Sequence, residues 1–292
     1  MSWRVTLRCT RAQAEALPES ELAFDSADPP VLVADEPDPS KPDDWQLHAY
    51  FDRAPSDEEI AALVRLADGE PRVEELGEND WVTMSQAGLE PIRAGRFFVH
   101  TPTYRGQPPG TVPFEVDAGL AFGTGQHATT AGCLEALDLL ETNGCRFANV
   151  ADIGTGTGLL AFAALALWPR ARCMATDIDP IAVDVARENA AINRVRLGHD
   201  AGELLLAVAN GMDSPMLSAR APFDLLIANI LAGPLIELAP EFAKAVAPGG
   251  TVILAGLLDT QAEAVTRAYE EAGFTLSDRG TGEWPVVSFT LA

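Results

Sequence analysis

Hydrophobic and polar positions follow one pattern in the first third of the chain. The runs Trp3–Cys9 and Trp45–Phe51 alternate apolar and polar residues, which predicts half-buried strands. Ser56 is followed by three acidic residues and then by apolar residues at helical spacing, so a helix is expected to begin there. The Pro- and Asp-rich stretch 25–44 predicts turns around a short strand at 31–33. This mixture indicates a small α+β unit.

From Val116 onward, predicted strands and helices alternate. The strands are expected at Asn149–Ile153, Arg172–Asp177, Phe223–Asn229, Thr251–Leu257 and Trp284–Leu291, and the helices at 159–168, 180–193, 235–246 and 261–272. Alternation of this kind is typical of a parallel sheet with helices on both faces, so the fold class is α/β. Residues 200–220 fit the alternation least well, and we interpret them as a partly helical excursion.

A cluster of Pro and Gly residues between 101 and 113 separates the two patterns. Such clusters are typical of loops and connectors between folded units. We therefore predict three parts: a first domain at 1–89, an interdomain linker at 90–115 and a second domain at 116–292.

Composition narrows the class of protein. The chain has 292 residues, of which 47% are hydrophobic and 22% charged, values typical of a globular protein rather than a disordered one. Its longest apolar run, Leu159–Trp168, has ten residues, about half of the roughly 20 that span a bilayer. The first residues lack the apolar stretch of a secretory signal. Four cysteines form no CxxC pair, so we expect a cytoplasmic protein with no membrane span, disulfide framework or metal site.

Acidic residues outnumber basic ones by a wide margin. The formal net charge is −23, and residues 1–100 hold 21 of the 43 acidic but only 9 of the 20 basic residues. A field of this sign repels phosphate backbones, so direct reading of nucleic acid is not expected. The negative charge can serve solubility, or it can form a docking surface for a basic protein. The net charge by itself does not distinguish these two explanations.

A glycine-rich turn indicates which class of ligand the protein binds. The sequence 152–158 follows a predicted strand and opens a helix, and glycines such as Gly154 and Gly156 let the backbone approach a ligand closely. Asp177 ends the next strand, where its carboxylate can accept both hydroxyls of a ribose. The GxGxG spacing, with Leu159 where dinucleotide sites prefer glycine, favours S-adenosylmethionine over NAD. The pair therefore predicts an adenosine-containing ligand.

Asn229 ends another predicted strand, in the sequence Ile227-Ala228-Asn229-Ile230. The carboxyl ends of strands in an open α/β sheet face the ligand crevice. There the amide oxygen and neighbouring carbonyls can hold an amine with its lone pair aimed at a methyl group, which makes Asn229 the candidate catalytic residue. The alternative is that Asn229 caps the following helix.

The segment 117–130 contains three glycines and Phe122, and it precedes a predicted helix. Such a loop can fold over a cofactor, with Thr130 supplying a hydroxyl. Helix capping by Thr129 and Thr130 is the alternative. His127 is expected to shape the loop rather than to act as a base.

Four segments, in the same order along the chain, resemble those of the S-adenosylmethionine-dependent methyltransferases of ribosomal protein L11. They are 91–99, 119–130 with its Gly-Leu-Ala-Phe-Gly-Thr-Gly run, Ala228-Asn229-Ile230-Leu231-Ala232-Gly233-Pro234, and Gly282-Glu283-Trp284. The resemblance covers nearly the whole chain. Two departures stand out: Ala118 occupies a position where the family usually has proline, and the stretch 200–220 is longer than expected.

This resemblance implies a Rossmann-like class I methyltransferase domain joined to a smaller, ferredoxin-like α+β domain that recognises the protein substrate. It implies methylation of lysine side chains and of the N-terminal α-amine of L11, a basic protein. The cofactor contacts carried over from the family are Thr130, Gly154, Asp177 and Asn229; Gly156 and Phe122 are added from the sequence around them.

Three other functions fit parts of the pattern. A methyltransferase that acts on another protein or on a small-molecule amine shares every cofactor argument. A binding module without turnover would need the cofactor segment but not the acceptor segment. A nicotinamide oxidoreductase is disfavoured by Leu159.

Overall fold

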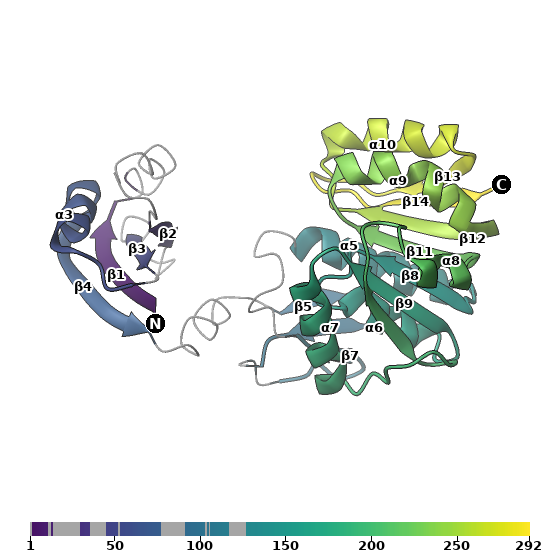
Figure 1. The fold of residues 1–292 in the computed structure, drawn as a ribbon, viewed down its shortest axis with the longest axis horizontal. Helices are drawn as coiled ribbons and strands as arrows, with labels where there is room; N and C mark the ends of the chain where they lie inside the picture. The colour runs from purple at the N-terminus through teal and green to yellow at the C-terminus, as the bar shows by residue number, and fades with distance from the viewer. Residues whose placement is uncertain are drawn as a thin grey trace. The chain divides into compact units, whose positions relative to one another are not determined.

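The computed structural model of the chain describes residues 2–10, 13, 30–35, 45–51, 53–76, 91–102, 104, 106–116 and 127–292. Two compact units are distinguished, Met1–Ser85 and Gln86–Ala292 (Figure 1). Each unit is described by itself below.

Unit 1 is built on a four-stranded antiparallel sheet in the order β2-β3-β1-β4. Its elements are β1 (Ser2–Cys9), β2 (Val31–Asp35), β3 (Trp45–Phe51), α3 (Asp57–Leu66) and β4 (Asp68–Leu76). This strand order is that of a split βαβ, or ferredoxin-like, sheet. Alternate residues of β1 and β3, including Val5 and Leu47, are buried together with Leu63 of α3.

The helix predicted after Ser56 is confirmed. Ser56 is the N-cap, and its hydroxyl accepts from the backbone N–H of Glu59 at 3.3 Å. The Glu59 carboxylate in turn accepts from the backbone N–H of Ser56 and receives a two-pronged ion pair from Arg53, at 2.8 and 2.9 Å. These contacts satisfy backbone donors that the start of a helix leaves free.

Unit 2 contains a seven-stranded sheet in the order β10-β9-β8-β11-β12-β14-β13. Its strands are β8 (Asn149–Ile153), β9 (Arg172–Asp177), β10 (Leu204–Val208), β11 (Phe223–Asn229), β12 (Val246–Ala255), β13 (Phe274–Arg279) and β14 (Val287–Leu291). The five strands from β10 to β12 are parallel, and β14 runs antiparallel between β12 and β13. Chain order reverses direction between β8 and β11, which creates the switch point where open α/β sheets bind ligands.

Helices cover both faces of this sheet, as the alternation predicts. They are α5 (His127–Thr142), α6 (Leu159–Leu167), α7 (Pro180–Ile192), α8 (Pro215–Arg220), α9 (Ala232–Ala245) and α10 (Asp259–Glu271). One core joins α5 and α6 to one face of the sheet, and a second core joins α8, α9 and α10 to the other (Figure 1). The α/β, Rossmann-like fold class is therefore confirmed.

Several local predictions differ from the structure. The strand predicted at Thr251–Leu257 begins earlier, because β12 spans Val246–Ala255. The stretch 200–220 is not merely a helical excursion, because its first part forms the edge strand β10. β13 was not predicted, because its alternation of apolar and polar residues is short: it covers only residues 274–277 and is followed by the charged Asp278 and Arg279. The last strand begins at Val287 rather than at Trp284, because residues 280–286 form the loop that returns from β13.

A second, three-stranded sheet lies in the range that we predict as a linker, 90–115. It consists of β5 (Ile92–Ala94), β6 (Phe97–His100) and β7 (Val112–Glu115). Phe97 and Phe114 are buried in the same core as α5 and α6, and the Phe114 ring lies 6.3 Å from that of Phe162. This part of 90–115 is therefore folded into unit 2 rather than forming a free connector.

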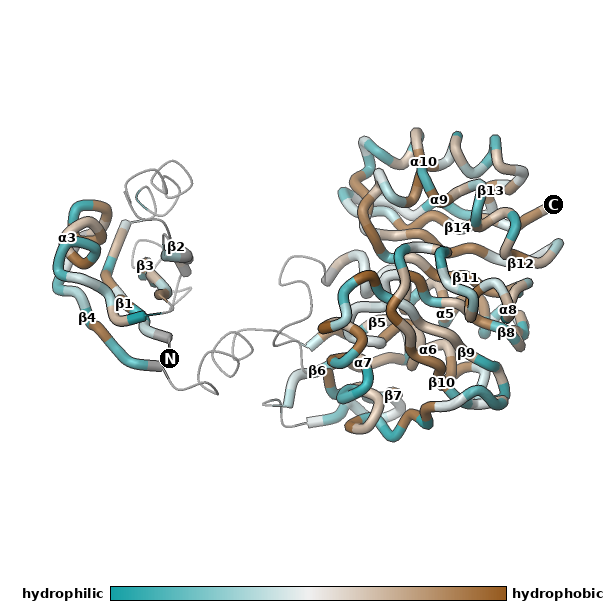
Figure 2. The backbone as a smooth tube through the Cα atoms, in the orientation of Figure 1, coloured by the Kyte–Doolittle hydropathy of each residue, from teal (hydrophilic) through white to brown (hydrophobic). Residues whose placement is uncertain are grey.

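The same sheet explains the apolar run that begins at Leu159. Residues 159–165 of α6 are all buried, because the helix packs against the seven-stranded sheet and also against the three-stranded one. A helix that is apolar on every side is expected where it is covered on every side. Figure 2 shows hydrophobic residues along the central strands of unit 2 and polar residues on its outer turns. Within the described residues, every helix falls short of the length and apolarity required to cross a membrane.

Candidate active site

The ends of three parallel strands bring the predicted site residues to one edge of the sheet. Ile153 of β8 pairs with Thr176 of β9 on one side and with Ala228 of β11 on the other. The residue after each of these positions is Gly154, Asp177 or Asn229, so all three lie at the same edge, at the switch point. A crevice at this place is the usual ligand site of the fold.

Hydrogen bonds from the glycine turn fix its shape. The backbone N–H groups of Gly154 and Thr155 donate to the Thr176 carbonyl at 2.8 and 2.9 Å. The N–H of Gly156 donates to Asp177 Oδ2 at 2.9 Å. Gly154, Gly156 and Gly158 have φ values of +74°, +53° and +85°, a region that side chains disfavour. The backbone conformation of the turn is therefore already sufficient reason for glycine at these three positions.

The three glycines differ in what lies in front of them. A Cβ on Gly154 would overlap the Ile230 side chain, and one on Gly158 would lie 2.5 Å from the Phe162 ring. Those two glycines serve the packing of the protein itself. At Gly156, no described atom lies within 4 Å of such a Cβ, so open space faces the turn there. Gly156 is the glycine whose backbone a bound ligand can approach.

Asp177 is held on both sides of its carboxylate. Oδ1 accepts from the backbone N–H of Asp179 at 3.0 Å, while Oδ2 accepts from Gly156. A carboxylate oxygen has two lone pairs, so each oxygen keeps one for a further donor. Two adjacent hydroxyls, as on a ribose, match this pair of free acceptors.

Exposed apolar side chains flank Asp177, and sequence reasoning missed them. Ile178 is 65% exposed and Val208, the strand partner of Asp177, is 51% exposed. Ile181, on the first turn of α7, is also exposed. Apolar surface beside a pair of hydroxyl acceptors suits the flat base of a nucleoside. The available signal was the apolar residue directly after Asp177.

Asp152 is a second carboxylate that sequence reasoning left without a role. It is 1% exposed, and its Oδ2 accepts from the Thr155 hydroxyl at 2.6 Å. Burial raises the pKa of Asp152 to about 7, against the opposing effects of Thr155 and of the backbone N–H of Ala161. Asp152 thus lies beneath the glycine turn, near the start of α6. Its position supports the glycine turn from inside the protein.

Asn229 has a buried amide oxygen that is not satisfied. Its Oδ1 has no hydrogen-bond partner among the described residues. The next helix, α9, has Leu231 at its cap and receives no side-chain cap, so the alternative role of Asn229 as a helix cap is not supported. Buried acceptors are nearly always paired in native proteins, so an orphan acceptor at a strand end is a mark of a functional site.

The structure says less about two other predicted site residues, Thr130 and Phe122. Thr130 is half-buried in the first part of α5, a helix that packs against β11 and β12. Because α5 begins at His127, Thr129 and Thr130 lie inside the helix rather than at its cap. Phe122 lies outside the described residues.

Asn189 of α7 and Asn193, which caps the C-terminal end of this helix, connect the site to the rest of unit 2. Asn189 is fully buried, and its amide donates to the carbonyl of Thr157 in the glycine turn at 3.1 Å. One turn later, Asn193 forms a pair of hydrogen bonds with the backbone of Glu115, at 2.9 and 2.7 Å. α7 thus connects the glycine turn with the end of β7.

These features fit S-adenosylmethionine. Asp177 has free acceptors for ribose hydroxyls, Gly156 faces open space, and Asn229 offers an unpaired acceptor where a reacting amine would be held. The described residues contain no group of three His, Cys, Asp or Glu side chains placed to hold a metal ion.

Comparisons with known proteins agree with this chemistry. The profile of the family described as Ribosomal protein L11 methyltransferase (PrmA) matches residues 5–291. The chain is 50% identical over 222 residues to a ribosomal protein L11 methyltransferase of Brucella abortus (strain S19), covering 75% of each chain. It is 40% identical over 283 residues to that of Caulobacter sp. (strain K31), covering 94% of this chain and 93% of the relative.

A solved structure is similar as well. It is a ribosomal protein L11 methylase from Lactobacillus delbrueckii subsp. bulgaricus, 27% identical, with a TM-score of 0.58 over 69% of this chain and 98% of that one. The similarity in sequence and in fold therefore points to one family.

Proposed function

The chain belongs to the ribosomal protein L11 methyltransferase family, and from this premise we propose that it methylates lysine side chains and the N-terminal α-amine of ribosomal protein L11. It is a class I methyltransferase, and its methyl donor is S-adenosylmethionine. The observation that carries the proposal is the buried Oδ1 of Asn229, which has no hydrogen-bond partner in the described part of the chain and lies at the carboxyl edge of the sheet, beside the glycine turn.

In this proposal, residues of unit 2 hold the cofactor. Asp177 accepts the ribose hydroxyls, Gly154 and Gly156 form the turn against which the cofactor lies, and Thr130 contributes a hydroxyl. The free lone pairs of Asp177 and the open space at Gly156 support these roles. Phe122 is proposed as a further contact from the sequence alone.

Bound S-adenosylmethionine supplies a methyl group activated by a positive sulfonium. The protein has to align the acceptor amine with that methyl group and keep water away, because an in-line displacement depends chiefly on position. Asn229 Oδ1 accepts a hydrogen bond from the amine and so directs the nitrogen lone pair toward the methyl group. Asn229 acts by orientation, not by removing a proton.

Deprotonation of the acceptor requires no dedicated base. At pH 7, deprotonating a lysine with a reference pKa of about 10.4 costs roughly 4 to 5 kcal/mol, and an α-amine near 7.7 to 8.0 costs only about 1 kcal/mol. Proximity to the positive sulfonium lowers the pKa of an amine further. An N-terminal amine is therefore the easier substrate, and a lysine becomes accessible through the same site.

Unit 1 is proposed to recognise L11. The acidity of the first 100 residues supports this role, because L11 is a basic protein and opposite charges favour association. A ribosomal substrate also supports action in the cytoplasm.

Mass spectrometry tests the proposal directly. The purified chain is incubated with purified L11 and S-adenosylmethionine, and the intact mass and the tryptic peptides of L11 are measured. We expect whole methyl increments on L11 that map to lysine side chains and to the N-terminus, and a much smaller extent of methylation with Asn229→Ala after the same time. A chain that methylates amines of a metabolite panel but leaves L11 unmodified would overturn the assignment of the substrate.

A further inference from the structure

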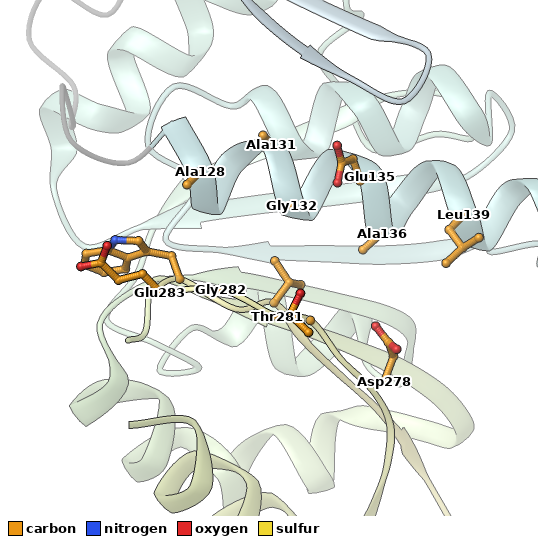
Figure 3. Close-up of a pocket in the computed structure, with 13 residues that line it drawn as sticks. Ala128, Ala131, Gly132, Glu135, Ala136, Leu139, Asp278, Thr281, Gly282 and Glu283 are labelled. Atoms are coloured by element: carbon orange, nitrogen blue, oxygen red, sulfur yellow. The ribbon is translucent and has the colours of Figure 1, made fainter. Parts of the chain in front are cut away.

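An open groove of about 630 Å³ runs along α5 in unit 2 (Figure 3). One wall is a single face of the helix, formed by Ala128, Ala131, Gly132, Glu135, Ala136 and Leu139. The other wall is the end of β13 and the loop that joins it to β14, residues 278–286. Small residues dominate the helix wall, so the groove is not filled by side chains of its own.

The two walls meet at Gly132. A Cβ on Gly132 would lie 2.6 Å from Cγ2 of Val286. The helix and the loop therefore touch along this line, which forms the floor of the groove.

The charged side chains among the described residues that line the groove are all acidic. Glu135, Asp278 and Glu283 line it and are exposed, and none of them forms an ion pair within the described part of the chain. Among the described residues that line the groove, none is a Lys, Arg or His. Arg279, which follows Asp278, is paired instead with Asp259 at 2.7 Å. The groove thus presents three carboxylates to a ligand without a counter-charge.

One end of the groove lies at the edge of the sheet that carries Asn229. Val287, directly after the loop, pairs with Leu254 of β12, and the carbonyl of Glu283 accepts from the backbone N–H of Asp259 at 2.9 Å. Asp259 follows β12, whose last residue, Ala255, pairs with Asn229. In Figure 3, Glu283 lies near Ala128, whereas Asp278 lies toward the Leu139 end. The groove therefore leads outward from the edge of the sheet that carries Asn229.

Its length suits a peptide. From Ala128 to Leu139 the helix advances about 16 Å, at about 1.5 Å per residue. An extended chain covers this distance with about five residues, at about 3.3 Å each. A small amine would fill only the inner end.

We propose that this groove binds the stretch of the protein substrate next to the methylated amine, as an extended and positively charged segment of about five residues. The inference rests on the proposed function and deepens it, because it assigns part of the recognition of the substrate to unit 2. The carboxylates at the outer end, Glu135 and Asp278, attract lysine or arginine side chains that neighbour the acceptor.

A double charge reversal, Glu135→Lys with Asp278→Lys, tests the groove with the full chain and purified L11. We expect the KM for L11 to rise roughly tenfold or more, because attraction becomes repulsion at two places. The kcat and the KM for S-adenosylmethionine should stay within about twofold, since neither residue belongs to the cofactor site. The tenfold effect should shrink in high salt.

The matched control is Glu270→Lys with Glu271→Lys at the end of α10, which changes the net charge equally on an exposed surface away from the groove. Its KM for L11 should match that of the unmodified chain.

If both double variants raise the KM for L11 alike, or if neither does, the groove has no role. A changed molar mass in solution with an unchanged KM would identify a second copy of this chain as the occupant and overturn the inference. Failure of the unmodified chain to methylate L11 would instead overturn the proposed function, and the groove assignment with it.

Discussion

The carboxylate of Asp177 accepts a hydrogen bond from the backbone N–H of Gly156, with 2.9 Å between Oδ2 and the nitrogen. The residue proposed to hold the ribose therefore also holds the turn that the cofactor would approach. Asp177 and Gly156 lie on successive β–α connections of the sheet, so the contact joins two strand ends into one rigid surface. Fixed acceptors of this kind lower the ordering cost of binding.

Replacement of Asp177 by asparagine should weaken cofactor binding. Asn keeps one acceptor for the turn, but its NH2 group replaces the oxygen that accepts from the backbone N–H of Asp179, and neither ribose hydroxyl keeps a charged acceptor. Hydrogen bonds to charged groups contribute about 1.5 to 3 kcal/mol, which predicts a Kd for S-adenosylmethionine raised by roughly 10- to 100-fold. Isothermal titration calorimetry measures this.

The control for Asp177→Asn is Asp184→Asn, an exposed carboxylate on α7 that pairs with Arg187. Its affinity for the cofactor should stay unchanged. Unchanged affinity in Asp177→Asn as well would remove the ribose assignment.

Replacement of Asn229 by alanine should separate activity from stability. The amide oxygen that is lost has no partner among the described residues, so its removal breaks no hydrogen bond within that part of the chain. We expect the free energy of unfolding to change by less than about 1 kcal/mol. Loss of the orienting acceptor should lower the single-turnover rate about 100-fold, as misplacement of reacting atoms does.

Rapid-quench measurement of methyl transfer and urea unfolding of the same Asn229→Ala sample give both quantities. A normal transfer rate would contradict the orienting role. A large loss of stability with a normal rate per folded molecule would show that Asn229 is structural instead.

Asp152 should make the stability of unit 2 depend on pH. Its pKa is about 7 in the folded protein, because burial disfavours the charge, whereas an unfolded Asp titrates near 3.9. Between about pH 4 and pH 7 the folded state holds a proton that the unfolded state has released. This contribution to the free energy of unfolding is complete below about pH 4 and is lost as the pH rises toward 7, by up to about 1.4 kcal/mol per unit.

Comparison with Asp152→Asn isolates this effect, since asparagine stays neutral throughout. Relative to the unmodified chain, the variant should gain stability as the pH rises from 4 to 8. Urea unfolding at several pH values measures the difference. A difference that stays constant with pH would mean that Asp152 titrates normally in the folded protein.

The sequence predicts much of unit 2 because its signals are local. Asp179 and Pro180 mark the start of α7, and Gly273, with φ +100°, ends α10 as expected. The meeting of Gly154, Asp177 and Asn229 at one edge also follows from sequence, because the carboxyl ends of parallel strands align.

What the sequence does not reveal depends on contacts between distant segments. The strand pairing of Phe97 with Val112 crosses a Pro- and Gly-rich loop, which by itself suggests only a connector. The burial of Asp152 and the unpaired Oδ1 of Asn229 result from packing around them and leave no mark in the local pattern. The groove along α5 arises likewise from a loop far along the chain.

Two truncations should show where the catalytic unit begins and what unit 1 does. A fragment of residues 86–292 keeps the three-stranded sheet, so it should fold and bind S-adenosylmethionine with the affinity of the full chain. A fragment of residues 116–292 loses Phe97 and Phe114 from the core that surrounds α6. Each large apolar side chain contributes about 1.5 to 3 kcal/mol on burial, so this shorter fragment should be largely unfolded by circular dichroism.

The longer fragment, 86–292, should bind the cofactor as the full chain does but show a much higher KM for L11. An unchanged KM for L11 would contradict recognition by unit 1.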